Sequence, residues 1–341
     1  MGAGNAGLAV ARAILPGNLM TSEPKVTVCV VAYNHERYIR ACLQSIVDQK
    51  TDFAFEVIVA DDCSKDGTAA IIAEFGERYP GLVKPLLRPV NIGGTANFLG
   101  THNLAGAVYV AHIDGDDLML PNKLQRQVDF LDANAEFSVV WHKVNLFDDQ
   151  GGFLSGDRYD LSFLPNGVMT LEHALRLGTF AAHSSIMYRR SARKTRQADF
   201  EVLDLFATWE YLSAGNGKIL DEILGSYRVS AQSSVQRKSM VNIQGYVAHH
   251  ARYYLKLMPE QRRNIFVLAV INFMVDLKNR RPTAWNFAKL AMASVSLVSP
   301  LLIVRTISEA RRIAPCSPAA GIQFAQSRQG EAAGAAGPPS P

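Results

Sequence analysis

Unbroken apolar runs and amphipathic stretches alternate along the first 145 residues of the chain. The runs at 26–32, 55–60 and 108–113 have the β-prone, apolar composition of strands that are buried on both faces of a sheet. Residues 36–49, by contrast, carry apolar side chains at the spacing of one helix face. Strands that alternate with helices are typical of βαβ units, so the pattern predicts an α/β fold, a mostly parallel sheet with flanking helices. Further expected elements are helices at 69–79, 95–104 and 121–133 and strands at 83–87 and 138–145.

Helical signals replace the strand pattern in the last third of the chain, through 242–279 and 284–312. Residues 317–341 contain 18 Ala, Gly, Pro or Ser residues. Such a composition cannot bury a core, so this end is expected to be disordered. The predicted organisation is a flexible segment at 1–24, an α/β domain at 25–235, a helical extension at 236–313 and a disordered tail at 314–341.

Composition narrows the class of protein only slightly. The 341 residues are 48% hydrophobic and carry a net charge of +4, which excludes a collagen, a disulfide scaffold and a wholly disordered chain. So mild a charge gives no support for nucleic-acid binding. The four cysteines have no CxxC spacing and the first residues lack the pattern of a cleaved secretory signal, so a cytoplasmic location is expected.

Two acidic clusters follow apolar strands directly. One contains Asp61 and Asp62, and the other contains Asp114, Asp116 and Asp117. Ligands of parallel sheets bind outside the carboxyl ends of the strands, where these five carboxylates would repel one another without a compensating charge. Mg²⁺ or Mn²⁺ prefers oxygen ligands and commonly bridges substrate phosphates, so a metal–diphosphate site is one interpretation. The other is an ordinary turn, because Asp and Gly are common turn residues.

Four sequence blocks together resemble the inverting family-2 glycosyltransferases. In order, they span 28–34, 59–68, 91–93 and 113–117. The resemblance covers about residues 25–235 and implies a GT-A fold, with a nucleotide-binding half at about 25–120 and an acceptor half at about 121–235. It also implies a nucleotide-diphospho-sugar donor, with a UDP-sugar favoured, and a divalent metal, Mg²⁺ or Mn²⁺, bound at a DxD motif.

The resemblance also implies roles for individual residues. Tyr33 would lie beside the nucleobase, Asp62 would bond a uracil-like ring, Asp114 would reach the ribose and Asp116 would bind the metal. The full donor-binding set that it implies is Tyr33, Asn34, Asp62, Asn91, Asp114 and Asp116, and the implied metal ligands are Asp116, Asp114 and Asp117.

The catalytic base has two candidates. Inverting transfer needs a carboxylate that takes the proton of the acceptor hydroxyl, and the family places it after the DxD motif. Asp204 is the first candidate and Glu210 the second, while His183 falls in a region that approaches the acceptor. The chain departs from the commoner family pattern at Ser230, where many members have His, and at Ala96-Asn97-Phe98, where many have Ala-Arg-Asn.

The predicted function is transfer of a sugar to a glycan or lipid-linked acceptor, in bacterial surface polysaccharide or cell-envelope glycan synthesis. A sugar-nucleotide nucleotidyltransferase and a catalytically silent sugar-nucleotide-binding protein remain as alternatives. The apolar segment at about 284–312, with Trp285, Pro300 and flanking Lys and Arg, has the composition of a bent interfacial helix. Peripheral attachment to the inner face of the cytoplasmic membrane and a homodimer are further hypotheses.

Overall fold

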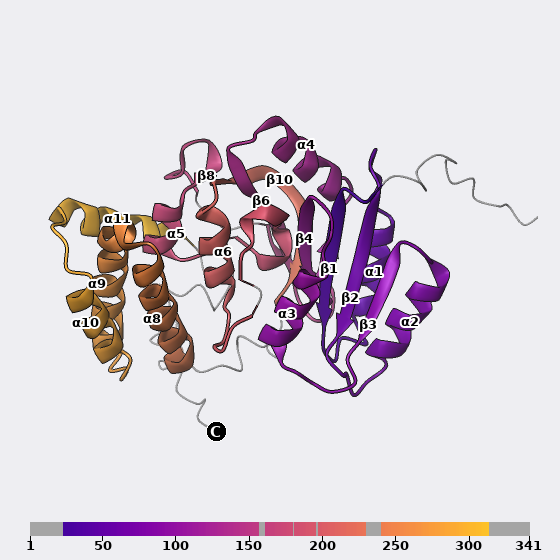
Figure 1. Ribbon diagram of the computed structural model, residues 1–341, viewed down its shortest axis with the longest axis horizontal. Coiled ribbons are helices and arrows are strands. Elements are labelled where there is room, and N and C mark those ends of the chain that lie inside the picture. The colour runs from indigo at the N-terminus through magenta and orange to yellow at the C-terminus, as the bar shows by residue number, and fades with distance from the viewer. Residues whose placement is uncertain (1–22, 157–160, 180, 196, 230–239, 314–341) are drawn as a thin grey trace, which may run out of the picture.

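The computed structural model describes residues 23–156, 161–179, 181–195, 197–229 and 240–313 (Figure 1). Most of the predicted N-terminal segment, the predicted disordered tail and Ser230 lie outside the described residues.

A mixed sheet forms the centre of the described chain (Figure 1). Its strands are β1 (Val26–Ala32), β2 (Phe55–Asp61), β3 (Val83–Leu87), β4 (Tyr109–Asp114), β5 (Leu118–Met119), β6 (Phe137–Phe147), β7 (Phe153–Ser155), β8 (Val168–Met169), β9 (Met187–Arg189) and β10 (Asn216–Arg228). Their order is β3-β2-β1-β4-β9-β6-β10-β5, with β7 beside β6 and β8 beside β10. β1 to β4 are parallel, whereas β9 runs antiparallel between β4 and β6. The predicted α/β fold with a mostly parallel sheet is confirmed.

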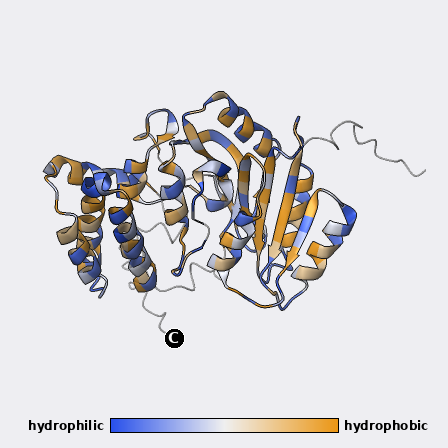
Figure 2. Ribbon diagram, in the orientation of Figure 1, coloured by the Kyte–Doolittle hydropathy of each residue, from blue (hydrophilic) through white to orange (hydrophobic). Residues whose placement is uncertain are grey.

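Helices cover both faces of this sheet (Figure 1). They are α1 (Ile39–Val47), α2 (Thr68–Arg78), α3 (Gly94–Asn103), α4 (Lys123–Ala133), α5 (Leu171–Leu177) and α6 (Asp204–Leu212). On one face, Ile39 of α1, Phe75 of α2 and Leu131 of α4 are buried against the strands. On the other face, Val110 of β4 packs in a second core with Phe206 of α6. The strands supply apolar side chains to both cores, which explains their unbroken apolar sequences (Figure 2).

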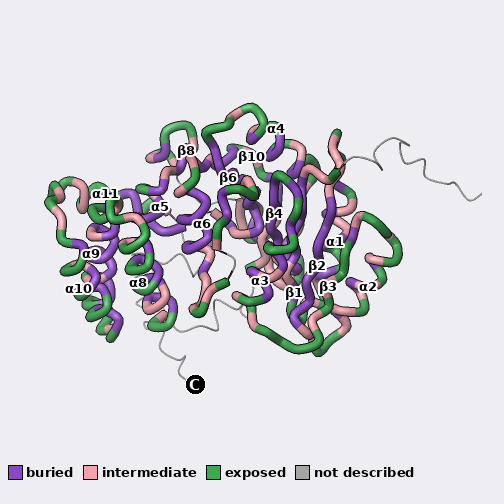
Figure 3. Tube along the Cα trace, viewed as in Figure 1, coloured by how far each residue is buried: buried purple, intermediate pink, exposed green. Residues whose placement is uncertain are grey.

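Four further helices extend the second core at the left of Figure 1. They are α8 (Met240–Leu257), α9 (Arg262–Lys278), α10 (Ala284–Ala293) and α11 (Pro300–Arg312). Tyr254, Ile265 and Phe287 are buried in the same cluster as residues of α5 and α6, and Figure 3 shows the buried side of these helices turned towards one another. The predicted helical extension is therefore present.

The prediction of one helical stretch over 284–312 is wrong in its middle. α10 ends at Ala293 and α11 begins at Pro300. The Ser294 hydroxyl donates to the carbonyl of Leu290 at 2.7 Å, and the Ser299 hydroxyl caps α11 by accepting from the N–H of Leu301. Serine side chains that bond the backbone, together with the missing N–H of proline, favour a helix end and a new start over a bend.

None of the helices in the described part of the chain has both the length and the apolar character that crossing a membrane requires.

Candidate functional site

The two acidic clusters meet at one edge of the sheet. In the parallel register, Ala32 of β1 pairs with Asp61 of β2, and Val31 pairs with Asp114 of β4. The carboxyl ends of the three strands therefore lie side by side. This agrees with the predicted site at the strand ends.

Asn34 and Gly115 shape the loops that leave these strands. Asn34 has a φ of 57°, which asparagine tolerates better than most residues. Its side-chain oxygen accepts from the N–H of Lys65 at 2.8 Å, and its own N–H donates to the Ser64 hydroxyl at 2.8 Å. At Gly115, a Cβ atom would lie 2.9 Å from Nδ1 of His35. Both residues therefore hold the site loops in close contact.

Asp62 is buried and is bonded by backbone amides. Its two carboxylate oxygens accept from the N–H groups of Ile92 at 2.8 Å and Gly93 at 2.9 Å. The side-chain amide of Asn91 donates to the carbonyl oxygen of Asp62 at 2.9 Å. A contact from Asp62 to a nucleobase stays a prediction, and it would use the remaining lone pairs of the carboxylate. Tyr33 next to this loop is 40% exposed, as a stacking surface must be.

Asp114 ends β4 between two side chains. Its N–H donates to the Ser184 hydroxyl at 3.0 Å, and its Oδ1 lies 3.3 Å from Nε2 of the buried His112. Burial tends to raise the pKa of Asp114, but the His112 hydrogen bond and the neighbouring imidazoles hold this pKa below its usual value. For Asp116 the pKa is raised, mainly by burial, with a contribution from the charge of Asp114. A cation beside these two groups would offset that repulsion.

Asp117 is buried beside the acidic loop. Its Oδ1 accepts from the N–H of Arg228 at 2.7 Å. The Arg228 side chain donates from Nε to the carbonyl oxygen of Asp116 at 3.1 Å, and its guanidinium lies 3.8 Å from the ring centre of Tyr38. Asp117 thus joins the end of β10 to the acidic loop. Metal ligation by Asp117 stays a prediction.

No group of three or more His, Cys, Asp or Glu side chains in the described ranges is arranged to hold a metal ion. A resident site made by the protein alone is therefore not present among these residues. Mg²⁺, however, is usually bound through one or two carboxylates together with substrate phosphates. Asp114 and Asp116 fit that kind of donor set, in which the substrate completes the coordination.

The structure brings Asp204 and His183 to the same region as Asp114. Asp204 is the first residue of α6, its side chain is 42% exposed, and its Oδ1 lies 3.8 Å from Nδ1 of His183. The His183 ring lies 4.2 Å from that of His112, and 5.5 Å from that of Phe98. A chain of contacts therefore links the Asp204 carboxylate to the Asp114 carboxylate.

Glu210 lies elsewhere. It is buried near the end of α6, and its Oε1 accepts from the N–H and the hydroxyl of Thr195 at 2.6 and 2.5 Å. These bonds fasten the segment that follows β9 to α6. Of the two predicted base candidates, Asp204 alone combines an exposed carboxylate with contact to the candidate site.

Sequence reasoning missed several side chains that build the site. His112 could have been found, because alternate residues of a strand share a face and His112 precedes Asp114 by two positions. His102 and Tyr188 come from distant segments and had no local signal. Lys123 is also buried, donates to the carbonyl oxygen of Ser184 at 2.6 Å, and has a pKa that burial lowers to about 7.

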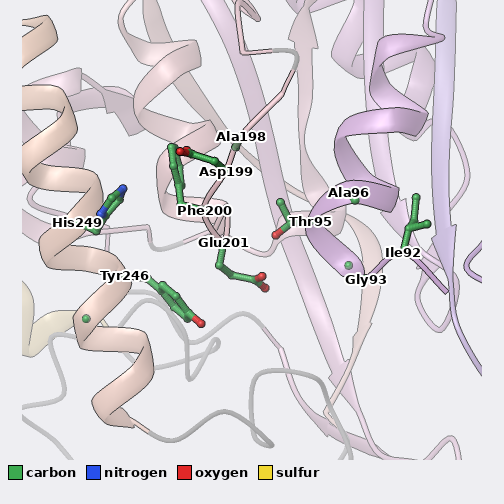
Figure 4. A pocket seen from close by; sticks show the side chains of 12 residues that line it. Ile92, Gly93, Thr95, Ala96, Ala198, Asp199, Phe200, Glu201, Tyr246 and His249 are labelled. Carbon is green, nitrogen blue, oxygen red and sulfur yellow. The ribbon is translucent and has the colours of Figure 1, made fainter.

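A cavity of about 740 Å³ adjoins the site (Figure 4). One wall is the start of α3, and the amides of Ile92 and Gly93 that bond Asp62 belong to this wall. Asp199, Phe200 and Glu201, just before Asp204, form a second wall, and α8 supplies a third with Gly245, Tyr246 and His249. The cavity has the size of small-molecule sites and combines aromatic rings with carboxylates.

Comparisons with known proteins point to one family. The model of glycosyl transferase family 2 matches residues 27–196. An uncharacterized protein of Mycobacterium tuberculosis is 34% identical over 60% of this chain, and the match spans 58% of that relative's length. EpsE of Bacillus subtilis, named as a glycosyltransferase, is 34% identical over 52% of the chain and 60% of its own. TuaG of B. subtilis, named as a teichuronic acid biosynthesis glycosyltransferase, is 25% identical over 63% of the chain and 83% of its own.

Solved structures share the fold. S. aureus TarS in complex with UDP-GlcNAc has a TM-score of 0.54 and 19% identity, covering 84% of this chain and 88% of TarS. The mannosyltransferase PcManGT from Pyrobaculum calidifontis, in complex with GDP-Man and Mn²⁺, has a TM-score of 0.53 and 17% identity, covering 86% of this chain and 82% of its own. The sequence motifs, the GT-A-like sheet and the family match together identify this chain as a member of glycosyl transferase family 2.

Proposed function

We propose that this protein is an inverting glycosyltransferase that moves a sugar from a nucleotide-diphospho-sugar to a hydroxyl group of a glycan or lipid-linked acceptor. The observation that carries the proposal is the proximity of two differently placed carboxylates. Asp114 ends β4, Asp204 begins α6, and His112 and His183 lie in contact between them. One carboxylate would hold the donor and the other would act on the acceptor.

In the proposed reaction, the acceptor oxygen attacks the anomeric carbon of the donor sugar. The bond from that carbon to the diphosphate oxygen breaks, and the nucleoside diphosphate leaves with the bonding electrons. Asp204 takes the hydroxyl proton as the new glycosidic bond forms, and later releases it to solvent. His183, 3.8 Å from Asp204, would keep the carboxylate directed at the cleft.

The donor is proposed to lie across the ends of β1, β2 and β4. Tyr33, Asn34, Asp62 and Asn91 would line the nucleoside end, and Asp114 would reach the ribose and, with Asp116, the metal on the diphosphate. A bound Mg²⁺ or Mn²⁺ would supply charge stabilisation for the leaving diphosphate. The Mn²⁺ in the PcManGT complex supports this choice of cofactor by likeness of fold, and the UDP-GlcNAc complex of TarS supports a UDP-sugar in the same way.

The acceptor is proposed to enter through the cavity in Figure 4. Aromatic rings such as those of Phe200 and Tyr246 suit the apolar face of a pyranose, and carboxylates such as Asp199 and Glu201 suit its hydroxyl groups. The teichuronic acid role in the name of TuaG supports a surface polysaccharide as the product.

The test is a screen of nucleotide sugars against the full chain. With Mn²⁺ present, we expect one UDP- or GDP-sugar to raise Tm, because a ligand that binds only the folded state stabilises it by about 2.7 kcal/mol at 100 times its Kd. The same donor should be hydrolysed slowly, and should be consumed faster when an acceptor glycan is added. Pyrophosphate release from UTP would instead indicate a nucleotidyltransferase, and binding without any turnover would indicate a silent binding protein.

We further propose that α10, α11 and their connection attach the protein to an anionic membrane surface. Phe287 and Leu290 are buried in the core, but the apolar residues on the outer side are largely exposed. These are Trp285 at 72%, Met292 at 67%, Val295 at 61%, Leu297 at 101%, Leu301 at 77% and Val304 at 62% exposure. Lys289 lies on the same face of α10 as Trp285 and Met292 by helical spacing. Exposed apolar groups next to a cation suit acyl chains and anionic headgroups.

Liposome flotation can check this attachment. The full chain is expected to float with phosphatidylglycerol-containing vesicles. The double substitution Leu297→Glu/Leu301→Glu should abolish flotation, because each exposed leucine would contribute up to about 2 kcal/mol of apolar transfer. Leu104→Glu/Val108→Glu is the matched control, since these residues are 56% and 58% exposed on the α/β domain. Equal flotation of both double variants would contradict the proposal.

A truncation at Arg281 is less informative, because it would remove the buried Phe287 and Leu290 from the core.

A further inference from the structure

A chain of buried polar side chains runs from Asp114 into the protein interior. Nε2 of His112 lies 3.3 Å from Oδ1 of Asp114, Nδ1 of His112 lies 3.0 Å from Nε2 of His102, and Nδ1 of His102 lies 2.6 Å from the Tyr188 hydroxyl. His112, His102 and Tyr188 are each at most 1% exposed. We propose that His112, held by His102 and Tyr188, is a positioning residue that orients the Asp114 carboxylate for donor binding. This inference rests on the proposed function.

A single arrangement of protons satisfies all three bonds of the chain. His102 and His112 are each at most 1% exposed, and a buried environment favours the neutral imidazole, which has one donor and one acceptor nitrogen. An ionised Asp114 can only accept, so Nε2 of His112 carries the proton and Nδ1 accepts from His102. Nδ1 of His102 then accepts from the Tyr188 hydroxyl. The chain therefore has one direction, from the phenol to the carboxylate.

Packing fixes the planes of the two imidazoles. The Phe98 ring lies 4.1 Å from the His102 ring and 5.3 Å from the His112 ring, and the His183 ring lies 4.2 Å from that of His112. Tyr188 is stacked on Tyr211 at 4.1 Å. Side chains that are locked by packing can hold a carboxylate within the narrow range of positions that binding requires.

The backbone adds to this rigidity. β4 is hydrogen-bonded to β1 on one side and to β9 on the other, and β9 carries Tyr188. The N–H of Asp114 is bonded to Ser184, so the carboxylate has few alternative positions. With Oδ1 engaged by His112, Oδ2 would contact the donor. Residues that orient a ligand-binding carboxylate in this way typically contribute 10- to 100-fold to affinity or activity.

Direct binding of UDP and of GDP in the presence of Mn²⁺, measured by titration calorimetry, tests the inference on the full chain. His112→Phe removes the donor to Asp114 and should weaken nucleotide binding by about 10- to 100-fold. His112→Gln keeps an N–H near the position of Nε2 and should recover most of that loss. Tyr188→Phe removes only the far end of the chain and should have a smaller effect. In turnover assays, the change in His112→Phe should be in KM for the donor, with kcat at saturation close to wild type.

His142→Phe is the matched control. His142 is also a buried imidazole in a neighbouring part of the sheet, but its Nδ1 bonds the carbonyl oxygen of Lys143. Its loss should leave nucleotide affinity unchanged, and Tm of every variant reports whether the fold is intact. The inference is overturned if a folded His112→Phe binds nucleotide as well as wild type, or if His112→Gln is no better than His112→Phe. A wild-type chain that binds no nucleotide would overturn the proposed function and this inference together.

Discussion

Replacing Asp204 with Asn is expected to lower kcat by about 10²- to 10⁴-fold, the usual contribution of a general base. The amide keeps the shape of the carboxylate but cannot take the proton of the acceptor hydroxyl. The side chain is 42% exposed and contacts His183 rather than the core, so the fold and the donor affinity should be retained. Single-turnover kinetics at saturating donor, together with nucleotide binding by calorimetry, would measure both effects.

Glu210→Gln is the control for this substitution. Glu210 accepts two hydrogen bonds from Thr195 in the protein interior, and hydrogen bonds to a charged group contribute about 1.5–3 kcal/mol. The variant should therefore lose part of this stability, seen as a lower Tm, while kcat changes little. The opposite pattern, an inactive but stable Glu210→Gln beside an active Asp204→Asn, would reverse the assignment of the base.

The secondary structure of the first half of the fold can be predicted from sequence because its strands are buried on both faces. The predicted bounds of β1 and β3 agree with the structure, those of β2 differ by one residue at one end, and those of β4 differ by one residue at both ends. The helix predicted at 36–49 begins later, at Ile39, because the N–H groups of Tyr38 and Ile39 both donate to the carbonyl oxygen of His35 in a turn. Local turns of this kind shift helix ends without changing the pattern of apolar residues.

The secondary structure of the second half is harder to predict from sequence because its strands are irregular. β10 runs from Asn216 to Arg228, but its register with β6 shifts in three places. Polar residues such as Lys218 and Asp221 interrupt its apolar pattern, so periodicity alone does not indicate a long strand here. β9 lies between β4 and β6 with only three residues. Long-range pairing, rather than local preference, determines these elements.

The candidate site also contains some residues that the sequence predicts and some contacts that it does not. Asp62, Asp114 and Asp116 follow strands and could be predicted, since strand ends in a parallel sheet share an edge. The contact of His183 with Asp204 joins residues 21 positions apart, and that of His102 with Tyr188 joins residues 86 positions apart. No periodicity in the sequence carries such information. The bond from the N–H of Arg228 to Asp117 likewise joins residues 111 positions apart.

Asp116→Asn is expected to lower activity as much as Asp204→Asn does. Its cause is different, because it removes charge stabilisation from the leaving diphosphate. Loss of a metal ligand removes several kcal/mol of charge stabilisation from the transition state, which corresponds to a fall in kcat/KM of about 10³-fold or more. Binding of UDP should also lose its dependence on Mn²⁺. Asp221→Asn is the control, because the Asp221 side chain is 88% exposed and is paired with Lys143 on the surface.

The Tm of Asp116→Asn distinguishes the loss of a metal ligand from simple unfolding of the variant. The pKa of Asp116 is raised, mainly by burial, so the folded state holds the carboxyl proton more tightly than the unfolded state does. Ionisation of Asp116 therefore destabilises the fold, and this cost appears as pH rises through the unfolded-state pKa and is complete above the folded-state pKa. Asn cannot ionise, so Tm of Asp116→Asn at pH 7 and without metal should equal or exceed that of wild type. A stable variant that keeps full activity, or wild-type activity that survives EDTA, would rule out Asp116 as a metal ligand, whereas a large fall in Tm would show that the carboxylate acts in folding.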